Sequence, residues 1–204
     1  MTKAPTHPLR IGVLGAPSTG KTLLVRRIDR ELRRRDISVE HTAHLGRRAT
    51  RVPLPQRQDL SADATRWAIA TGIADEVEAA ARPGHDGPRV VLADQVGWEA
   101  LACFRAAQEW HSRAAPPRTD REALHRLASA HAPYDLLFAT HLDPGLRVRR
   151  EHGYDSRYRI LVDRHIHRLL REEGLAYVPV TSDRASQEQA VMRAVQTCHS
   201  QAPL

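Results

Sequence analysis

Residues 15–22 combine residue types and spacing that could bind a nucleotide. They read Gly-Ala-Pro-Ser-Thr-Gly-Lys-Thr and match the pattern G-x-x-x-x-G-K-[ST] at every fixed position. An apolar run over residues 9–14 precedes them, and apolar residues recur at helical spacing over residues 23–32. A strand, a glycine-containing loop and a helix in this order form a cradle for phosphate. We therefore predict a nucleoside triphosphate site, a P-loop with a Walker A motif.

The residue types of this loop explain how it would hold the phosphates. Glycine at 15 and 20 permits close approaches that a side chain would block, so successive N–H groups can face phosphate oxygens. Lys21 is expected to reach the β- and γ-phosphates, and the Thr22 hydroxyl to bind Mg²⁺. Thr181, after the last predicted strand, marks where we expect the adenine base. The predicted nucleotide-binding residues are Gly15, Ala16, Pro17, Ser18, Thr19, Gly20, Lys21, Thr22, Leu23 and Thr181.

Two acids at predicted strand ends are candidates for metal binding and proton transfer. Asp94 ends a continuous apolar run over residues 90–93, which is typical of a central parallel strand, and there it can face Mg²⁺ beside Thr22. The alternative is that Asp94 caps the next helix. Glu40 ends a predicted strand over residues 37–42, across the expected crevice from the loop. Glu40 is our first candidate to bind or deprotonate an acceptor, with Asp94 as the competing base and a solvated strand end as the alternative.

Arginines are concentrated over residues 143–158, a polar predicted loop that contains Gly145 and Gly153. This composition suits a mobile lid. Guanidinium groups on a closing lid can stabilise the charge that phosphoryl transfer spreads over oxygens, while the lid excludes water. The alternative is a solvated charge run. The candidate catalytic residues are Lys21, Asp94, Glu40, Arg147, Arg149, Arg150 and Arg157, and Arg159 lies just beyond the predicted loop.

Two histidine pairs, His41 with His44 and His165 with His167, invite a metal hypothesis. Neither pair has a third ligand at close spacing, so we predict that both are surface histidines. The two cysteines fit no metal spacing, and we expect reduced thiols in a reducing compartment.

Length and composition limit the class of protein. The chain has 204 residues, and we expect a single domain over residues 9–198 with flexible tails at 1–8 and 199–204. The net charge of +7 comes almost wholly from arginine, without the interleaved aromatic residues that single-strand nucleic-acid binding needs. We expect this charge to attract phosphorylated small molecules instead. No apolar run suggests a membrane span, so we expect a soluble cytoplasmic protein, and a homodimer stays open.

Strands and helices alternate along the chain. Further strands are predicted over 134–139 and 176–180, and helices over 22–35, 61–82, 97–111, 119–130, 159–173 and 186–197. We expect Ser61 to cap the second of these helices, and a capping box from Thr119 to open the fourth. The predicted fold is α/β: a three-layer α/β/α P-loop NTPase with a mainly parallel five-stranded sheet, nucleoside-kinase-like, with an Arg-rich lid.

A GTPase-like switch is the alternative from another class. Residues 94–97, Asp-Gln-Val-Gly, resemble D-x-x-G, and residues 140–143 distantly resemble the guanine motif N-K-x-D. Small GTPases join their second and third strands by a tight hairpin, whereas here a predicted helix lies between them. A helix of this kind can connect two parallel strands but does not fit in a tight hairpin, which counts against a small GTPase. An NTP-hydrolysing regulatory switch is therefore only the second hypothesis.

Several segments together resemble a known family. The phosphate loop, Ser-Ala-Asp at 61–63, Val-Val-Leu-Ala-Asp at 90–94, Tyr-Asp-Leu-Leu at 134–137 and Tyr-Val-Pro-Val at 177–180 look like the kinase domain of the ribosylnicotinamide kinases. These are P-loop small-molecule kinases often labelled AAA-domain ATP-binding proteins. The resemblance covers most of residues 9–197. It implies that ATP occupies the loop and that a nucleoside hydroxyl receives the γ-phosphate. It also implies that Lys21 binds the phosphates and that Thr22 and Asp94 bind Mg²⁺.

The chain departs from the family pattern on the acceptor side. Val96 stands where the family tends to carry a second Asp, and the lid pattern Asp-Gly-Leu-Arg is not reproduced in place. These changes leave the acceptor open between nicotinamide riboside and a different nucleoside, sugar or specialised metabolite. Trp98 and Tyr154 are candidates to stack on an acceptor ring, although a Trp on a helix face is more often a core residue.

Overall fold

Five parallel strands form a sheet in the order β2-β3-β1-β4-β5. The computed structural model describes residues 7–42, 45–49, 51–55, 57–82, 89–94, 96–114, 116–130, 134–143 and 155–200. The strands are β1 Leu9–Gly15, β2 Ser38–His41, β3 Arg89–Asp94, β4 Leu136–Thr140 and β5 Val178–Val180. Because β1 is the central strand, the loop that follows it opens at the middle of the carboxyl edge, where ligands bind in open α/β sheets.

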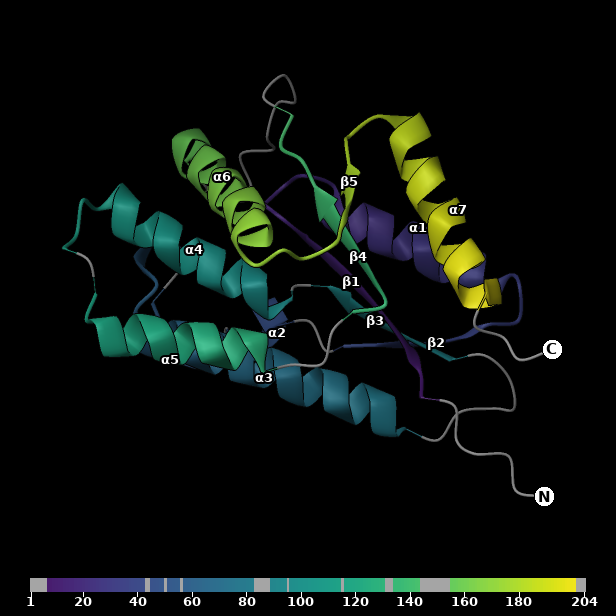
Figure 1. The fold of residues 1–204 in the computed structure, drawn as a ribbon, viewed down its shortest axis with the longest axis horizontal. Coiled ribbons are helices and arrows are strands. Elements are labelled where there is room, and N and C mark those ends of the chain that lie inside the picture. Colours follow the sequence, from purple (N-terminus) through teal and green to yellow (C-terminus); the bar gives the residue numbers. More distant parts are fainter. Residues whose placement is uncertain are drawn as a thin grey trace.

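Helices cover both faces of the sheet, which confirms the predicted three layers (Figure 1). They are α1 Lys21–Arg33, α2 Leu45–Ala49, α3 Ala62–Ala81, α4 Gly97–Trp110, α5 Arg118–Ser129, α6 Ser156–Glu172 and α7 Arg184–Ser200, with a short 3₁₀ helix, η1 Arg57–Asp59. α1 and α7 pack together on one face, whereas α3, α4, α5 and α6 lie on the other. No helix in the described part of the chain has the length and apolar character to cross a membrane.

Alternation along the central strands divides the apolar side chains between two cores. Ile11 and Val13 of β1 pack with α1 and α7, while Leu14 packs with α4 and α6. In β4, Phe138 belongs to the first core and Leu137 to the second. Successive side chains of a strand point to opposite faces, so the same strands support both cores.

The strand register decides which residues meet the phosphate loop. Val13 of β1 pairs with Asp94 of β3, and Gly15 pairs with Thr140 of β4. Asp94 and Thr140 therefore flank the start of the loop from its two neighbouring strands. The predicted apolar run ending on Asp94 is confirmed as a central strand.

Local predictions of helix starts met different outcomes. The Ser61 cap is confirmed, since its Oγ accepts a hydrogen bond from the Ala64 N–H at 3.1 Å. The capping box from Thr119 is wrong, because α5 begins one residue earlier, after Pro117, and Thr119 lies inside the helix. Proline favours this boundary because it brings no N–H and fixes its own φ. The short elements α2 and η1 were not predicted.

Candidate functional site

The loop between β1 and α1 has the backbone geometry of a phosphate cradle. Ser18 and Gly20 both have positive φ, 60° and 92°, and Gly20 is the N-cap of α1 without a side-chain cap. The first N–H groups of α1 have no intrahelical acceptor, and the helix dipole places positive potential there. The predicted nucleotide-binding residues 15–23 are thus brought to one helix N-terminus, which is suited to an anion.

Gly15 is required by a close approach between β1 and β4. A Cβ at Gly15 would lie 1.8 Å from Thr140 Oγ1 and 3.0 Å from the Thr140 carbonyl oxygen. Thr140 is hydrogen-bonded to Thr19, with 2.6 Å between the hydroxyl oxygens, and the Thr19 hydroxyl lies 2.8 Å from the Ala16 carbonyl. Thr140, at the end of β4, therefore packs against the loop and supports it. Only glycine leaves enough room for this contact at position 15.

Lys21 is buried and folded back onto its own loop. Its Nζ donates to the carbonyls of Gly15 and Ala16, the latter at 3.0 Å. It also forms an ion pair with Glu99 Oε1 at 3.4 Å, and the other oxygen of Glu99 accepts from the Gly15 N–H at 3.2 Å. The lysine is thus held at the loop by three acceptor groups.

Glu99 is the site residue that our sequence analysis missed. It lies in the first turn of α4, where an acid ordinarily complements the helix dipole, and it is 3% exposed. The available signal was its position five residues after Asp94, in a helix that begins at the carboxyl edge of the sheet. Its contact with Lys21 depends on how β1 packs against α4, which no local pattern encodes.

Asp94 and Thr22 lie together beside the loop. The Thr22 hydroxyl donates to Asp94 Oδ2 at 3.4 Å, a long hydrogen bond between groups that both remain accessible to solvent. A hydroxyl and a carboxylate are the oxygen ligands that Mg²⁺ prefers. The two predicted metal ligands are therefore brought to one place, and their donor set fits that ion.

Arg159 reaches the loop from α6. Its side chain is 4% exposed, and its Nε donates to the Pro17 carbonyl at 2.9 Å. Burial lowers the pKa of its guanidinium group. Arg157, two residues earlier, is exposed in the first turn of α6. The other candidate lid residues, Arg147, Arg149 and Arg150, lie outside the described residues.

Glu40 is not brought to the loop. It pairs with Val91 of β3, three residues before Asp94, which places it about 10 Å short of the carboxyl edge. Its Oε2 forms an ion pair with Arg82 Nη1 at 3.0 Å, just beyond α3. The geometry favours the alternative of a solvated strand end, with Glu40 partly exposed and paired with Arg82 at the edge of the sheet.

Thr181, predicted to lie near the adenine base, is exposed, whereas Trp98, a candidate to stack on an acceptor ring, is buried. Thr181 is exposed after β5, and its N–H donates to Ser186 Oγ at 3.0 Å, so it belongs to the turn that opens α7. Trp98 is 7% exposed and packs edge-on against His125, with 5.6 Å between ring centroids. Trp98 is therefore a core residue. Tyr154 lies outside the described residues.

The predicted surface location of the histidine pairs is wrong for one pair. His165 and His167 are 9% and 6% exposed, because His165 is covered on the side of Glu109 in α4 and His167 on the side of His141, after β4. His41 is partly exposed and hydrogen-bonded to Asp29 at 2.9 Å, while His44 lies outside the described part of the chain. Residues three apart on α6 share a face, but His165 and His167 are two apart and reach different neighbours.

A family model described as AAA domain matches residues 10–188. No curated protein matches the sequence. Two structures of the NadR protein, one in complex with NR and one with NAD and AMP-PNP, have TM-scores of 0.65 and 0.67 at 20% identity. They cover 94% and 95% of this chain, which spans about half of the NadR chains, 51% and 50%.

Thymidylate kinase from Ehrlichia chaffeensis also has this fold, with a TM-score of 0.58 at 11% identity. The similar region covers 92% of this chain and 99% of the thymidylate kinase chain. These similarities confirm the predicted nucleoside-kinase-like α/β fold. They leave the individual roles of the loop and lid residues as predictions.

Proposed function

The chain belongs to the AAA-domain family, and on that premise we propose that it is an ATP- and Mg²⁺-dependent kinase. It would transfer the γ-phosphate to a hydroxyl of a small nucleoside-like acceptor. The observation that carries this proposal is the complete phosphate loop with Asp94 hydrogen-bonded to Thr22 at 3.4 Å. The kinase-like fold supports it, since the structures of NadR and thymidylate kinase are similar to that of this chain.

Thr22 and Asp94 would hold Mg²⁺, which would neutralise charge on the bound phosphates. The loop amides would bind the phosphate oxygens, and Lys21 would turn from the carbonyls of Gly15 and Ala16 toward them. One or more of Arg147, Arg149 and Arg150 from the predicted lid, or Arg157 from the first turn of α6, would approach the transferred group.

Asp94 is our first choice for the group that accepts the acceptor's proton. It lies at the carboxyl edge, whereas Glu40 is paired with Arg82 about 10 Å before that edge. A carboxylate must come within hydrogen-bonding reach of the hydroxyl to act as a base. Glu40 therefore becomes the second choice.

An acceptor panel tests the proposed activity. ADP formation from ATP and Mg²⁺ is measured with nicotinamide riboside first, because a structure of the similar NadR protein holds NR, and then with other nucleosides and sugars. We expect turnover that depends on one acceptor and yields its phosphorylated form by mass spectrometry. ATP hydrolysis that no acceptor accelerates would contradict the proposal.

Two substitutions connect that activity to the site. Lys21→Ala and Asp94→Asn are each expected to lower kcat/KM about 100-fold or more, as loss of a charge-stabilising group does. Asp63→Asn is the matched control, because its carboxylate is exposed in the first turn of α3. Equal activity of Asp94→Asn and the control would remove Asp94 from the mechanism.

The nucleotide-dependent switch remains the second candidate. β2 and β3 are parallel with α3 between them, which differs from the hairpin of small GTPases and favours the kinase. A preference for GTP over ATP, with acceptor-independent hydrolysis stimulated by a protein partner, would favour the switch instead.

A further inference from the structure

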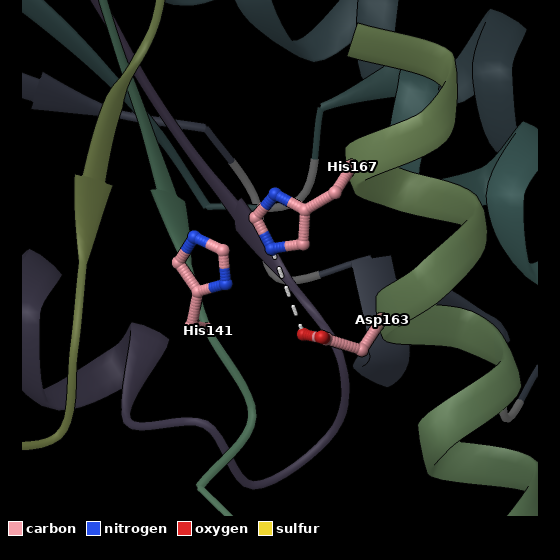
Figure 2. A group of neighbouring side chains, drawn as sticks. All are labelled: His141, Asp163 and His167. Carbon is pink, nitrogen blue, oxygen red and sulfur yellow. Dashed lines mark ion pairs between the residues drawn. The ribbon is translucent and has the colours of Figure 1, made fainter. Parts of the chain in front are cut away.

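His141, Asp163 and His167 gather at the carboxyl end of β4, on the side of α6. His141 follows β4 directly, and the other two lie one turn apart on α6 (Figure 2). One ligand atom from each lies within 4.8 Å of the other two. The proposed kinase activity uses none of these side chains.

His167, the histidine from the helix, is buried and poorly satisfied by the polar groups of the described residues. Neither ring nitrogen of His167 is hydrogen-bonded among the described residues, and the side chain is 8% exposed. Its polar neighbours include the Thr140 backbone, His141, Arg171 and Asp163, whose Oδ1 lies 3.7 Å from Nε2. A buried polar group without partners is costly, so this arrangement favours a ligand that occupies the space between the three residues.

We propose that His141, Asp163 and His167 bind a divalent transition metal ion of the Zn²⁺ type. Two imidazoles and one carboxylate are a typical donor set for Zn²⁺ with an open fourth position. Ligands at about 2.1 Å from a tetrahedral ion lie about 3.4 Å apart, close to the 3.7 Å between Asp163 and His167.

The surroundings support ligation. The Leu142 N–H donates to Asp163 Oδ1 at 3.0 Å and orients the carboxylate, as outer hydrogen bonds do at metal sites.

One ring must turn for all three groups to reach the same ion. The rings of His141 and His167 are stacked, with centroids 3.8 Å apart and planes 7° from parallel. His167 is fixed on a packed helix, whereas His141 is half-buried at the end of its strand. We therefore expect the His141 ring to tilt, which brings its nitrogen toward Asp163. The ion would then tie β4 to α6, the elements on either side of the predicted lid.

Binding is measured on the untagged full-length chain after chelator treatment and exchange into chelator-free buffer. Zn²⁺ is titrated by calorimetry and by competition with a chromophoric chelator. Wild type is expected to bind Zn²⁺ stoichiometrically with a raised Tm, and Co²⁺ to give the visible absorption of a tetrahedral site. Mg²⁺ at the same concentration is expected to leave the Co²⁺ absorption unchanged, because hard cations take oxygen ligands.

Variants assign the ion to these three residues. His141→Ala and Asp163→Asn are each expected to weaken Zn²⁺ binding at least about tenfold. His165→Gln is the matched control, since this neighbouring buried histidine instead bonds Glu109 at 2.9 Å. His141→Ala removes only a half-buried side chain directly after β4, so we expect this variant to fold. It therefore tests the site even if the Asp163→Asn variant does not fold. No stoichiometric binding, or wild-type affinity in the folded variants, would overturn the proposal.

Discussion

Lys21 already has strong partners before a phosphate reaches it. Glu99 is only 3% exposed, and its carboxylate touches both the lysine ammonium group and the Gly15 N–H. A buried ion pair is sensitive to the loss of one partner, because the remaining charge stays in a poorly solvated place. Glu99 thus opposes any movement of Lys21 toward a nucleotide.

Glu99→Gln should separate folding from nucleotide binding. We expect the free energy of unfolding to fall by about 2 kcal/mol, because Lys21 loses its buried counter-charge. We expect ATP to bind about fivefold more tightly, because phosphate no longer competes with a carboxylate. Urea unfolding and calorimetric ATP binding measure the two effects. Glu122→Gln, at an exposed ion pair on α5, is the control. Weaker ATP binding would mean that Glu99 positions Lys21 for phosphate.

Arg159 and Arg157 offer a matched pair on one helix. Arg159→Gln removes the buried bond to the Pro17 carbonyl, so the free energy of unfolding should fall by about 1–3 kcal/mol and ATP binding should weaken. Arg157→Gln changes an exposed side chain and should shift stability by no more than about 0.5 kcal/mol. Equal stability losses in the two variants would show that the Pro17 contact does not support the loop.

At the scale of elements, Gly15 of β1 leaves no room for a side chain beside Thr140 of β4. Gly15→Ala should lower the free energy of unfolding by about 3 kcal/mol, since its Cβ would overlap the Thr140 hydroxyl. Thr140→Ala should cost about 1 kcal/mol through its lost hydrogen bond to Thr19. The free energy of unfolding of the double variant should fall by less than the sum of the two single losses, by at least about 1 kcal/mol. The reason is that Thr140→Ala removes the hydroxyl that the Cβ of Gly15→Ala would overlap.

Gly72→Ala is the control for this cycle. A Cβ at Gly72 meets nothing within 4 Å in α3, so alanine should raise the free energy of unfolding by about 0.5–1 kcal/mol. Urea unfolding of all the variants supplies the measurements. Strict additivity of Gly15→Ala and Thr140→Ala would show that another contact decides the cost at Gly15.

Elements with a local cause could be predicted from the sequence, and non-local contacts could not. The apolar run ending on Asp94 and the cap at Ser61 depend on neighbouring residues, and both are observed. The edge strands β2 and β5 are shorter than predicted, since each has a partner on one side only. The Glu99 ion pair and the His141, Asp163, His167 group need long-range packing, which sequence spacing does not contain.

Over the whole molecule, two cores share the strands β1 and β4. Cys103 lies in the core formed with α3, α4, α5 and α6, and Cys198 lies in the core formed with α1 and α7. Both are buried free thiols, which agrees with the predicted reduced state. We propose that residues 9–198 act as a single domain, because unfolding either core would expose the other face of the same strands.

The two cysteines make that proposal measurable in the unmodified chain. Pulsed alkylation in increasing urea, read by peptide mass spectrometry, reports each core separately. Burial raises the pKa of Cys198 to about 11, so its folded thiolate fraction at pH 8 is about 100-fold below that of a thiol with the ordinary value of 9.0. We expect both cysteines to become reactive at the same urea concentration, and saturating ATP to raise both midpoints equally, since it binds the folded state. Earlier labelling of Cys198 would show that α7 detaches before the sheet unfolds, which would divide the domain into two cooperative units.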